Sequence, residues 1–278
     1  AFGQGALQRG GLDHSTGIVF HTINPVGICR QPGEGHPIRR QPLSGATPPT
    51  GWPASYTQNY YIPNDNPWLN TGGTVLASGS LILGHKDALS TGGLNVTAAS
   101  TLQAGVDLSG ANAIMNNVTL SEALTVSGVN SLTLAGITTQ NGGNRTLTSS
   151  LTGPAALLIN QLNLAETASV AARNLTISGT GLTTINTLVN NDQNNILTNN
   201  MTVNTLTIGT ATISDSAVVG RTLELGGTGN TTVTGLIENV AGGGGVAGTL
   251  QKTGAGTLTL QGTNTFTGPV NLNGGNLD

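Results

Sequence analysis

The feature that most constrains the fold is a tripeptide that returns along most of the chain: an aliphatic residue, usually Thr or Asn, and a second aliphatic residue. Alternation with a period of two over so short a run is typical of a β-strand, because successive side chains leave a strand on opposite faces. Gly, Asn, Ser or Thr bounds most copies, so the predicted strands are very short. The copies are Leu81-Ile82-Leu83, Leu94-Asn95-Val96, Leu124-Thr125-Val126, Leu132-Thr133-Leu134, Leu162-Asn163-Leu164, Leu175-Thr176-Ile177, Leu206-Thr207-Ile208, Leu223-Glu224-Leu225 and Leu258-Thr259-Leu260.

The spacing of these tripeptides separates the possible all-β architectures, which are a sandwich, a propeller and a solenoid. The starts at Leu132 and Leu162 are about thirty residues apart, as are those at Leu175 and Leu206, and this interval falls in the range of coil-by-coil repeat proteins. Helices are not expected in this part, because Gly, Asn, Thr and Ser are poor helix formers. The spacing favours the solenoid.

The composition fits the stacked coils of a solenoid. Only 8% of the residues are charged and 42 are glycine, whereas about 25% are charged in typical soluble domains. Coils that stack at about 4.8 Å place like residues on one another, so uncharged Thr and Asn are favoured outside and Gly is favoured at the corners. We predict an all-β fold, a right-handed parallel β-solenoid (β-helix) over residues 71–278.

Proline separates a different region near residue 70. Nine of the 11 prolines lie at or before Pro67, and both tryptophans and all three tyrosines lie between Trp52 and Trp68. This stretch lacks strand or helix patterning and favours extended polyproline conformations. We therefore expect an irregular Pro-rich and aromatic N-terminal arm or cap at 1–70. The chain begins at Ala1, which fits a removed signal peptide or a trimmed chain.

Charge and hydrophobicity exclude two classes of partner. The net charge is −3 and the nine Lys and Arg residues form no basic stripe, so nucleic acid is not an expected partner. No apolar run approaches the roughly 18 to 20 residues of a membrane-spanning helix. The hydrophobic residues, 36% of the chain, recur in order, which disfavours disorder.

Near its C-terminus the chain resembles a known family. Residues 248–275 read GTLQKTGAGTLTLQGTNTFTGPVNLNGG, and this stretch is similar to the passenger-associated strand repeat of bacterial autotransporters. The resemblance implies a parallel β-helix, an extracellular or cell-surface location and secretion from a Gram-negative bacterium. Pro269 departs from the family pattern, in which a small or β-branched residue is usual. The matching positions are Leu250, Lys252, Gly254, Gly256, Leu258, Leu260, Gly262, Asn264, Phe266, Thr267 and Gly268, with Val270, Gly274 and Leu277 more loosely.

Few residues in this chain could build a reactive site, and we expect no catalytic residue, cofactor or small-molecule substrate. The weak metal candidates are His14, His21, Cys29 and His36, whose spacing does not bring two ligands within a few residues of each other. The alternative is that the three histidines are polar loop residues and that Cys29 is a lone thiol without a ligand role. Glycoside cleavage needs two carboxyl groups that converge in a cleft. The acidic residues of this chain are isolated in the sequence, so they are interpreted as solvated surface charges. They are Asp87, Asp107, Glu122, Glu166, Asp192, Asp215, Glu224 and Glu238.

Two further patterns follow from the Gly- and Asn-rich composition. The run Gly242–Gly245 lacks the Lys-Ser/Thr of a phosphate-binding loop and is interpreted as a projecting loop. Six Asn-Xaa-Thr sequences would matter only in a glycosylating secretory route. They begin at Asn95, Asn117, Asn144, Asn174, Asn200 and Asn230.

Together these features predict an extracellular structural scaffold with one of two roles. In the first, other copies of the chain are the partners, and the arm joins subunits head to tail into a fibre, since an end at Asp278 leaves a sheet edge open. In the second, the chain is an adhesive passenger that binds a host or neighbouring-cell surface. The alternative is a polysaccharide-active enzyme on a β-helix. The candidate intersubunit contacts are Trp52, Tyr56, Tyr60, Tyr61, Trp68, Phe266 and Pro269.

Overall fold

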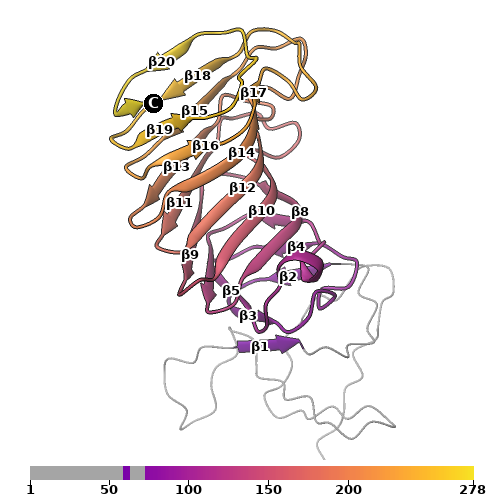
Figure 1. The fold of residues 1–278 in the computed structure, drawn as a ribbon. Coiled ribbons are helices and arrows are strands. Elements are labelled where there is room, and N and C mark those ends of the chain that lie inside the picture. The colour runs from indigo at the N-terminus through magenta and orange to yellow at the C-terminus, as the bar shows by residue number, and fades with distance from the viewer. Residues whose placement is uncertain (1–58, 63–72) are drawn as a thin grey trace, which may run out of the picture.

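The computed structural model describes residues 59–62 and 73–278, and within these residues the fold is a parallel β-solenoid (Figure 1). The coils stack into an elongated body with β2 (Thr74–Leu76) near one end and β20 (Val270–Leu272) and β21 (Asn276–Leu277) at the other. The only helical element among the described residues is one 3-10 turn, Gly110–Asn112. The predicted all-β parallel solenoid is confirmed.

Two sheets run along the body, and each coil contributes to both. The first sheet has ten parallel strands. In spatial order these are β1 (Asn59–Ile62), β3 (Gly79–Leu83), β5 (Ser100–Ala104), β7 (Leu124–Gly128), β9 (Arg145–Leu151), β11 (Asn174–Gly179), β13 (Ile196–Met201), β15 (Thr222–Gly226), β18 (Thr249–Lys252) and β20.

The second sheet has eleven strands and contains the longest ones. Next to β2 come β4 (Leu94–Val96), β6 (Val118–Leu120), β8 (Leu132–Gln140), β10 (Ala156–Asn163), β12 (Leu182–Val189), β14 (Leu206–Thr212), β16 (Thr231–Val233), β19 (Thr257–Leu260) and β21. The short β17 (Ile237–Glu238) pairs with the second half of β14. Register-paired residues on neighbouring coils are about 20 to 30 residues apart in sequence.

The long strands of the second sheet change direction near their middle, where glycine recurs. The register of β8 and β10 shifts at this point, and the coil after β14 is divided there into β16 and β17. An added Cβ at Gly209 would overlap the carbonyl oxygen of Asn186 in the preceding coil, and one at Gly235 would lie 2.6 Å from that of Gly209. We call this line the glycine bend; its glycines are Gly136, Gly209, Gly235 and Gly262.

The core is a stack of aliphatic side chains from both sheets. Strands such as β4 and β6 show a buried, half-buried, buried pattern, as period-two alternation predicts. Aliphatic residues stack on one another from coil to coil, so each side chain is covered from both sides along the axis. One such ladder in the second sheet is Leu134, Ile159, Ile185, Ile208, Val233 and Leu260.

Uncharged polar residues form the matching ladders outside, as predicted. In the second sheet, register places Thr184, Thr207, Thr232 and Thr259 in one line across four coils. In the first sheet the hydroxyl oxygens of Thr148 and Ser178 lie 2.9 Å apart in a hydrogen bond. The predicted preference for Thr, Ser and Asn on the outer faces is therefore seen as direct coil-to-coil contact.

One strand of the predicted arm lies within the described residues. β1 pairs in parallel with β3, and Tyr60 is opposite Leu81 and Tyr61 opposite Ile82 in the register. The backbone of residues 59–62 therefore extends the first sheet of its own chain at the N-terminal end of the solenoid.

Candidate functional site

The turns that lead from the second sheet into the first carry most of the charged side chains of the described residues. We call this edge the charged corner; its longer turns are 164–173, 190–195, 213–221 and 239–248. The side chains concerned are Glu122, Arg145, Glu166, Arg173, Asp192, Asp215, Arg221 and Glu238. Because these charged groups gather on one edge, this edge is the candidate site for catalysis or ligand binding.

Three arginines lie at the charged corner, each at or just before the start of a strand of the first sheet. Each forms an ion pair with a carboxylate, and each guanidinium-bearing side chain is only 14 to 18% exposed. Fully exposed pairs contribute about 0 to 1 kcal/mol, and partial burial weakens solvent screening but adds a desolvation cost. The pairs are Arg173 Nη2 to Glu166 Oε1 at 2.5 Å, Arg221 Nε to Asp215 Oδ1 at 3.6 Å and Arg145 Nη1 to Glu122 Oε1 at 3.8 Å.

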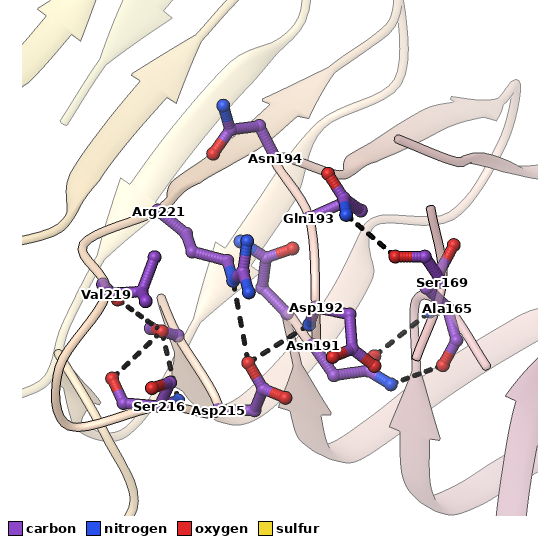
Figure 2. Close-up of polar contacts among 12 residues, drawn as sticks. Ala165, Ser169, Asn191, Asp192, Gln193, Asn194, Asp215, Ser216, Val219 and Arg221 are labelled. Carbon is purple, nitrogen blue, oxygen red and sulfur yellow. Dashed lines mark hydrogen bonds and ion pairs between the residues drawn. The ribbon is translucent and has the colours of Figure 1, made fainter. Parts of the chain in front are cut away.

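Carboxylates at this corner also accept hydrogen bonds from backbone N–H groups of the preceding coil. Asp192 Oδ2 accepts from the N–H of Ala168 at 2.7 Å. Asp215 Oδ1 accepts from the N–H of Asp192 at 3.0 Å (Figure 2). Glu166 Oε2 accepts from the N–H of Gly142 at 3.3 Å. The donor residues Ala168, Asp192 and Gly142 have φ of 61°, 59° and 72°, all in the left-handed region. The carboxylates thus bind N–H groups of turns that leave the sheet ladders.

The ion pair of Glu166 determines its protonation. The hydrogen bond from Arg173 lowers the pKa of Glu166, and burial of the carboxyl acts in the opposite direction without overcoming it. The same hydrogen bond raises the pKa of Arg173. Both groups are therefore charged at neutral pH, and Glu166 is not poised to transfer a proton.

Buried amides fix the same turns to one another. The Asn191 side chain accepts from the N–H of Ala165 at 3.0 Å and donates to the Ala165 carbonyl oxygen (Figure 2). Gln193 Nε2 donates to the carbonyl oxygen of Ser169 at 2.7 Å. Satisfying buried backbone groups in this way removes the cost of leaving them unpaired. The amides make the turns parts of the fold rather than parts of a free binding surface.

The geometry of these carboxylates differs from that of a glycosidase. Glycoside cleavage needs two carboxyl groups that face each other across a cleft, whereas Glu166, Asp192 and Asp215 are turned toward backbone N–H groups and arginines. A hollow of about 140 Å³ lies instead between the turns at 201–205 and 228–230, and its lining contains no charged residue. Within the described residues, no group of three His, Cys, Asp or Glu side chains could hold a metal ion.

Lys252 occupies a position that the coils on either side of it fill with Leu. It follows Leu197 and Leu225 in an inward-facing ladder and is 3% exposed. Its ammonium donates to the carbonyl oxygens of Thr253, of Gly254 at 3.0 Å and, in the next coil, of Gly274 at 3.4 Å. Burial lowers its pKa. The side chain therefore joins the last two coils by a charged contact in the interior.

The predicted contact residues are not brought together as one surface among the described residues. Phe266 is half-buried against the core, and the carbonyl oxygen of the exposed Pro269 accepts from the N–H of Leu250 at 3.1 Å. Tyr60 and Tyr61 lie in β1 at the opposite end of the body. The other candidates, Trp52, Tyr56, Trp68, His14, His21, Cys29 and His36, lie outside the described residues.

The last two coils, formed by β18 to β21, are packed through glycine. Added Cβ atoms at Gly256, Gly262 and Gly268 would overlap the backbones of Gly229, Gly235 and Gly248, each in the preceding coil. Asn264 Oδ1, in the turn before β20, accepts from the N–H of Ile237 at 2.9 Å, which fixes this turn to the coil before it. The spacing of these glycines is therefore a requirement of close coil stacking.

The same part of the chain matches a known family of repeats. Residues 247–278 match the passenger-associated-transport-repeat. Over these residues, and in its parallel solenoid fold, the chain is similar to the repeats of autotransporter passengers. The comparisons with curated proteins and with solved structures find no match. No helix among the described residues is long and apolar enough to cross a membrane.

Sequence reasoning did not find two features of this edge. It interpreted the carboxylates as solvated charges, whereas the structure pairs three of them, Glu122, Glu166 and Asp215, with arginines at one corner. In two of the three pairs the signal was an acidic residue six or seven positions before an arginine that itself precedes a strand pattern, as in Glu166 to Arg173. The interior place of Lys252 could have been inferred from its alternation with Leu250.

Proposed function

We propose that this protein is an extracellular or cell-surface structural protein, a rigid β-solenoid scaffold without catalytic activity. The observation that carries the proposal is the passenger-associated-transport-repeat at 247–278, in a solenoid whose corner carboxylates make contacts between coils. Passenger-like repeats point to display outside the cell. Continuous ladders and a stacked aliphatic core give a stiff rod, in which stability is the sum of coils and of their neighbour contacts.

The finer role that we favour is a fibre subunit that joins head to tail through its N-terminal arm. Support comes from β1, which shows that a segment of the arm has the register and length to extend the first sheet as an added strand. A head-to-tail contact through such a strand does not close on itself and so generates a filament.

Electron microscopy with light scattering tests this role. The full chain and a variant lacking residues 1–70, which removes β1 together with the rest of the arm, are compared over a range of concentrations. A fibre subunit gives filaments that lengthen with concentration and that the deletion abolishes. Short monodisperse rods from both proteins contradict the fibre role and leave the adhesive one, for which binding of the rod to intact cells is then the measurement.

A further inference from the structure

The six Asn-Xaa-Thr sequences share one geometry in the solenoid. In all but one the middle residue is buried, as with Val118 and Leu175, so the Asn and Thr side chains leave the strand on the outer side, two residues apart. The exception is Arg145, which is half-buried. The Asn and Thr of each motif are therefore outward-facing residues of the alternating strand pattern, and both the amide and the hydroxyl face away from the core.

Four of these asparagines are exposed and are held in one orientation. In each, Oδ1 accepts a hydrogen bond from a backbone N–H of the next coil. The contacts are Asn117 to Ile137 at 2.9 Å, Asn144 to Asn174 at 2.9 Å, Asn200 to Thr228 at 3.2 Å and Asn230 to Thr257 at 3.0 Å. A backbone N–H is only a donor, so the atom that it contacts must be the amide oxygen.

The fixed oxygen leaves the amide nitrogen free. Among the described residues, none accepts a hydrogen bond from Nδ2 of Asn117, Asn144, Asn200 or Asn230. The hollow of about 140 Å³ lies beside two of these motifs, since Thr202 and Asn230 are in its lining. Each of the four thus presents an oriented, unpartnered amide nitrogen to solvent, with a threonine hydroxyl two residues away.

The other two motifs differ. Asn95 and Asn174 are half-buried, and their Oδ1 atoms contact the hydroxyls of Ser121 at 3.2 Å and Thr198 at 2.9 Å. A hydroxyl can donate or accept, so these contacts do not fix which amide atom is free. Asn194 has the geometry of the four sites without their sequence. It is exposed and its Oδ1 accepts from the N–H of Thr222 at 2.8 Å, but Ile196 stands where the Asn-Xaa-Thr sequence requires Thr.

We propose that Asn117, Asn144, Asn200 and Asn230 are N-glycosylation sites that take a sugar from a diphosphate-activated donor. In the transfer, Nδ2 forms a bond to the anomeric carbon while the bond from that carbon to the diphosphate oxygen breaks. The amide nitrogen releases one proton to solvent, and the nucleoside or lipid diphosphate leaves with the electron pair of the broken bond. The modified amide keeps its Oδ1, so the hydrogen bond to the next coil persists and the sugar extends into solvent.

Peptide mass spectrometry of the protein isolated from its source cells tests the proposal. The expected result is a sugar-sized mass increment on the four asparagines and unmodified side chains at Asn95, Asn174 and Asn194. A single-hexose increment identifies a nucleotide-activated donor, and a larger preassembled glycan identifies a lipid-linked one. Unmodified asparagine at all four sites overturns the proposal, as does equal occupancy at the three comparison sites.

Two variants made in the source cell separate the motif from the environment. Thr119→Val removes the hydroxyl with little change in shape and should abolish the increment at Asn117 alone. Ile196→Thr completes the motif at Asn194 and should create a fifth site. Circular dichroism confirms that both variants fold. An increment that persists at Asn117, or none at Asn194 in the folded Ile196→Thr variant, contradicts the assignment. Neither outcome depends on whether the rod polymerises.

Discussion

The glycine bend and the charged corner lie on the same coils but hold them together by opposite means. At the bend, the backbone of one coil approaches the next so closely that Gly209 and Gly235 leave no room for a Cβ. At the charged corner the turns vary in length, and side chains such as Glu166 and Asp192 reach across to bind backbone N–H groups. The bend fixes coil spacing, and the corner tolerates insertions because side chains span the gaps.

The largest expected effect is at the bend. Gly209→Ala puts a Cβ against the carbonyl oxygen of Asn186, which cannot move without shifting its strand. We expect a loss of about 3 kcal/mol in the free energy of unfolding, the upper range for overpacking. The matched control is Gly143→Ala, where the nearest atoms belong to the side chain of Arg145 rather than to the backbone of a neighbouring coil. Urea unfolding of both variants checks this, and equal losses would contradict the close-contact explanation.

A smaller loss is expected when an ion pair of the charged corner is removed. Arg173→Met keeps most of the aliphatic stem and deletes the charged partner of Glu166, whose side chain is 26% exposed. We expect a loss of about 1 kcal/mol in the free energy of unfolding, near the upper value for exposed pairs. Lys86→Met, at an exposed pair with Asp87, should change it by less. A loss at Arg173 as large as that at Gly209 would remove the contrast between the two regions.

A single side-chain hydrogen bond between coils should contribute a comparable or smaller amount. Asn230→Ala removes the acceptor of the Thr257 N–H. It should lower the free energy of unfolding by about 1 kcal/mol, the usual net value of one such bond. Asn230→Asp keeps an acceptor oxygen at that place and should be nearly neutral at pH 7. Equal destabilisation by both substitutions in thermal unfolding would show that the hydrogen bond is not the cause.

The smallest expected effect is a change in pH dependence. Because the pKa of Glu166 is lower in the folded chain than its ordinary value of 4.5, the ionised carboxylate stabilises the fold above that value. This stabilisation is lost as the pH falls from about 4.5 through the folded pKa. Glu166→Gln should therefore unfold with a flatter dependence on pH below 5. A variant whose stability falls as steeply as that of the native chain in acid would contradict the assigned ion pair.

Local patterning predicted the repeating part of this molecule and could not predict its long-range contacts. Tripeptides such as Leu94-Asn95-Val96 specify a strand and its buried face by themselves, so the strands and Thr ladders followed from sequence. The pairing of Arg221 with Asp215 depends on the path of a turn, which residue types do not determine. The line of glycines at the bend becomes visible only when the coil register is known.

Surface display of the solenoid is the central claim, and an epitope placed in the loop at 241–247 tests it most directly. Gly242 to Gly245 all have positive φ, and most have nothing close to an added Cβ, so a short insertion there should leave the coils intact. The prediction is antibody labelling of intact source cells that external protease removes. Labelling that appears only after the cells are permeabilised would contradict the account.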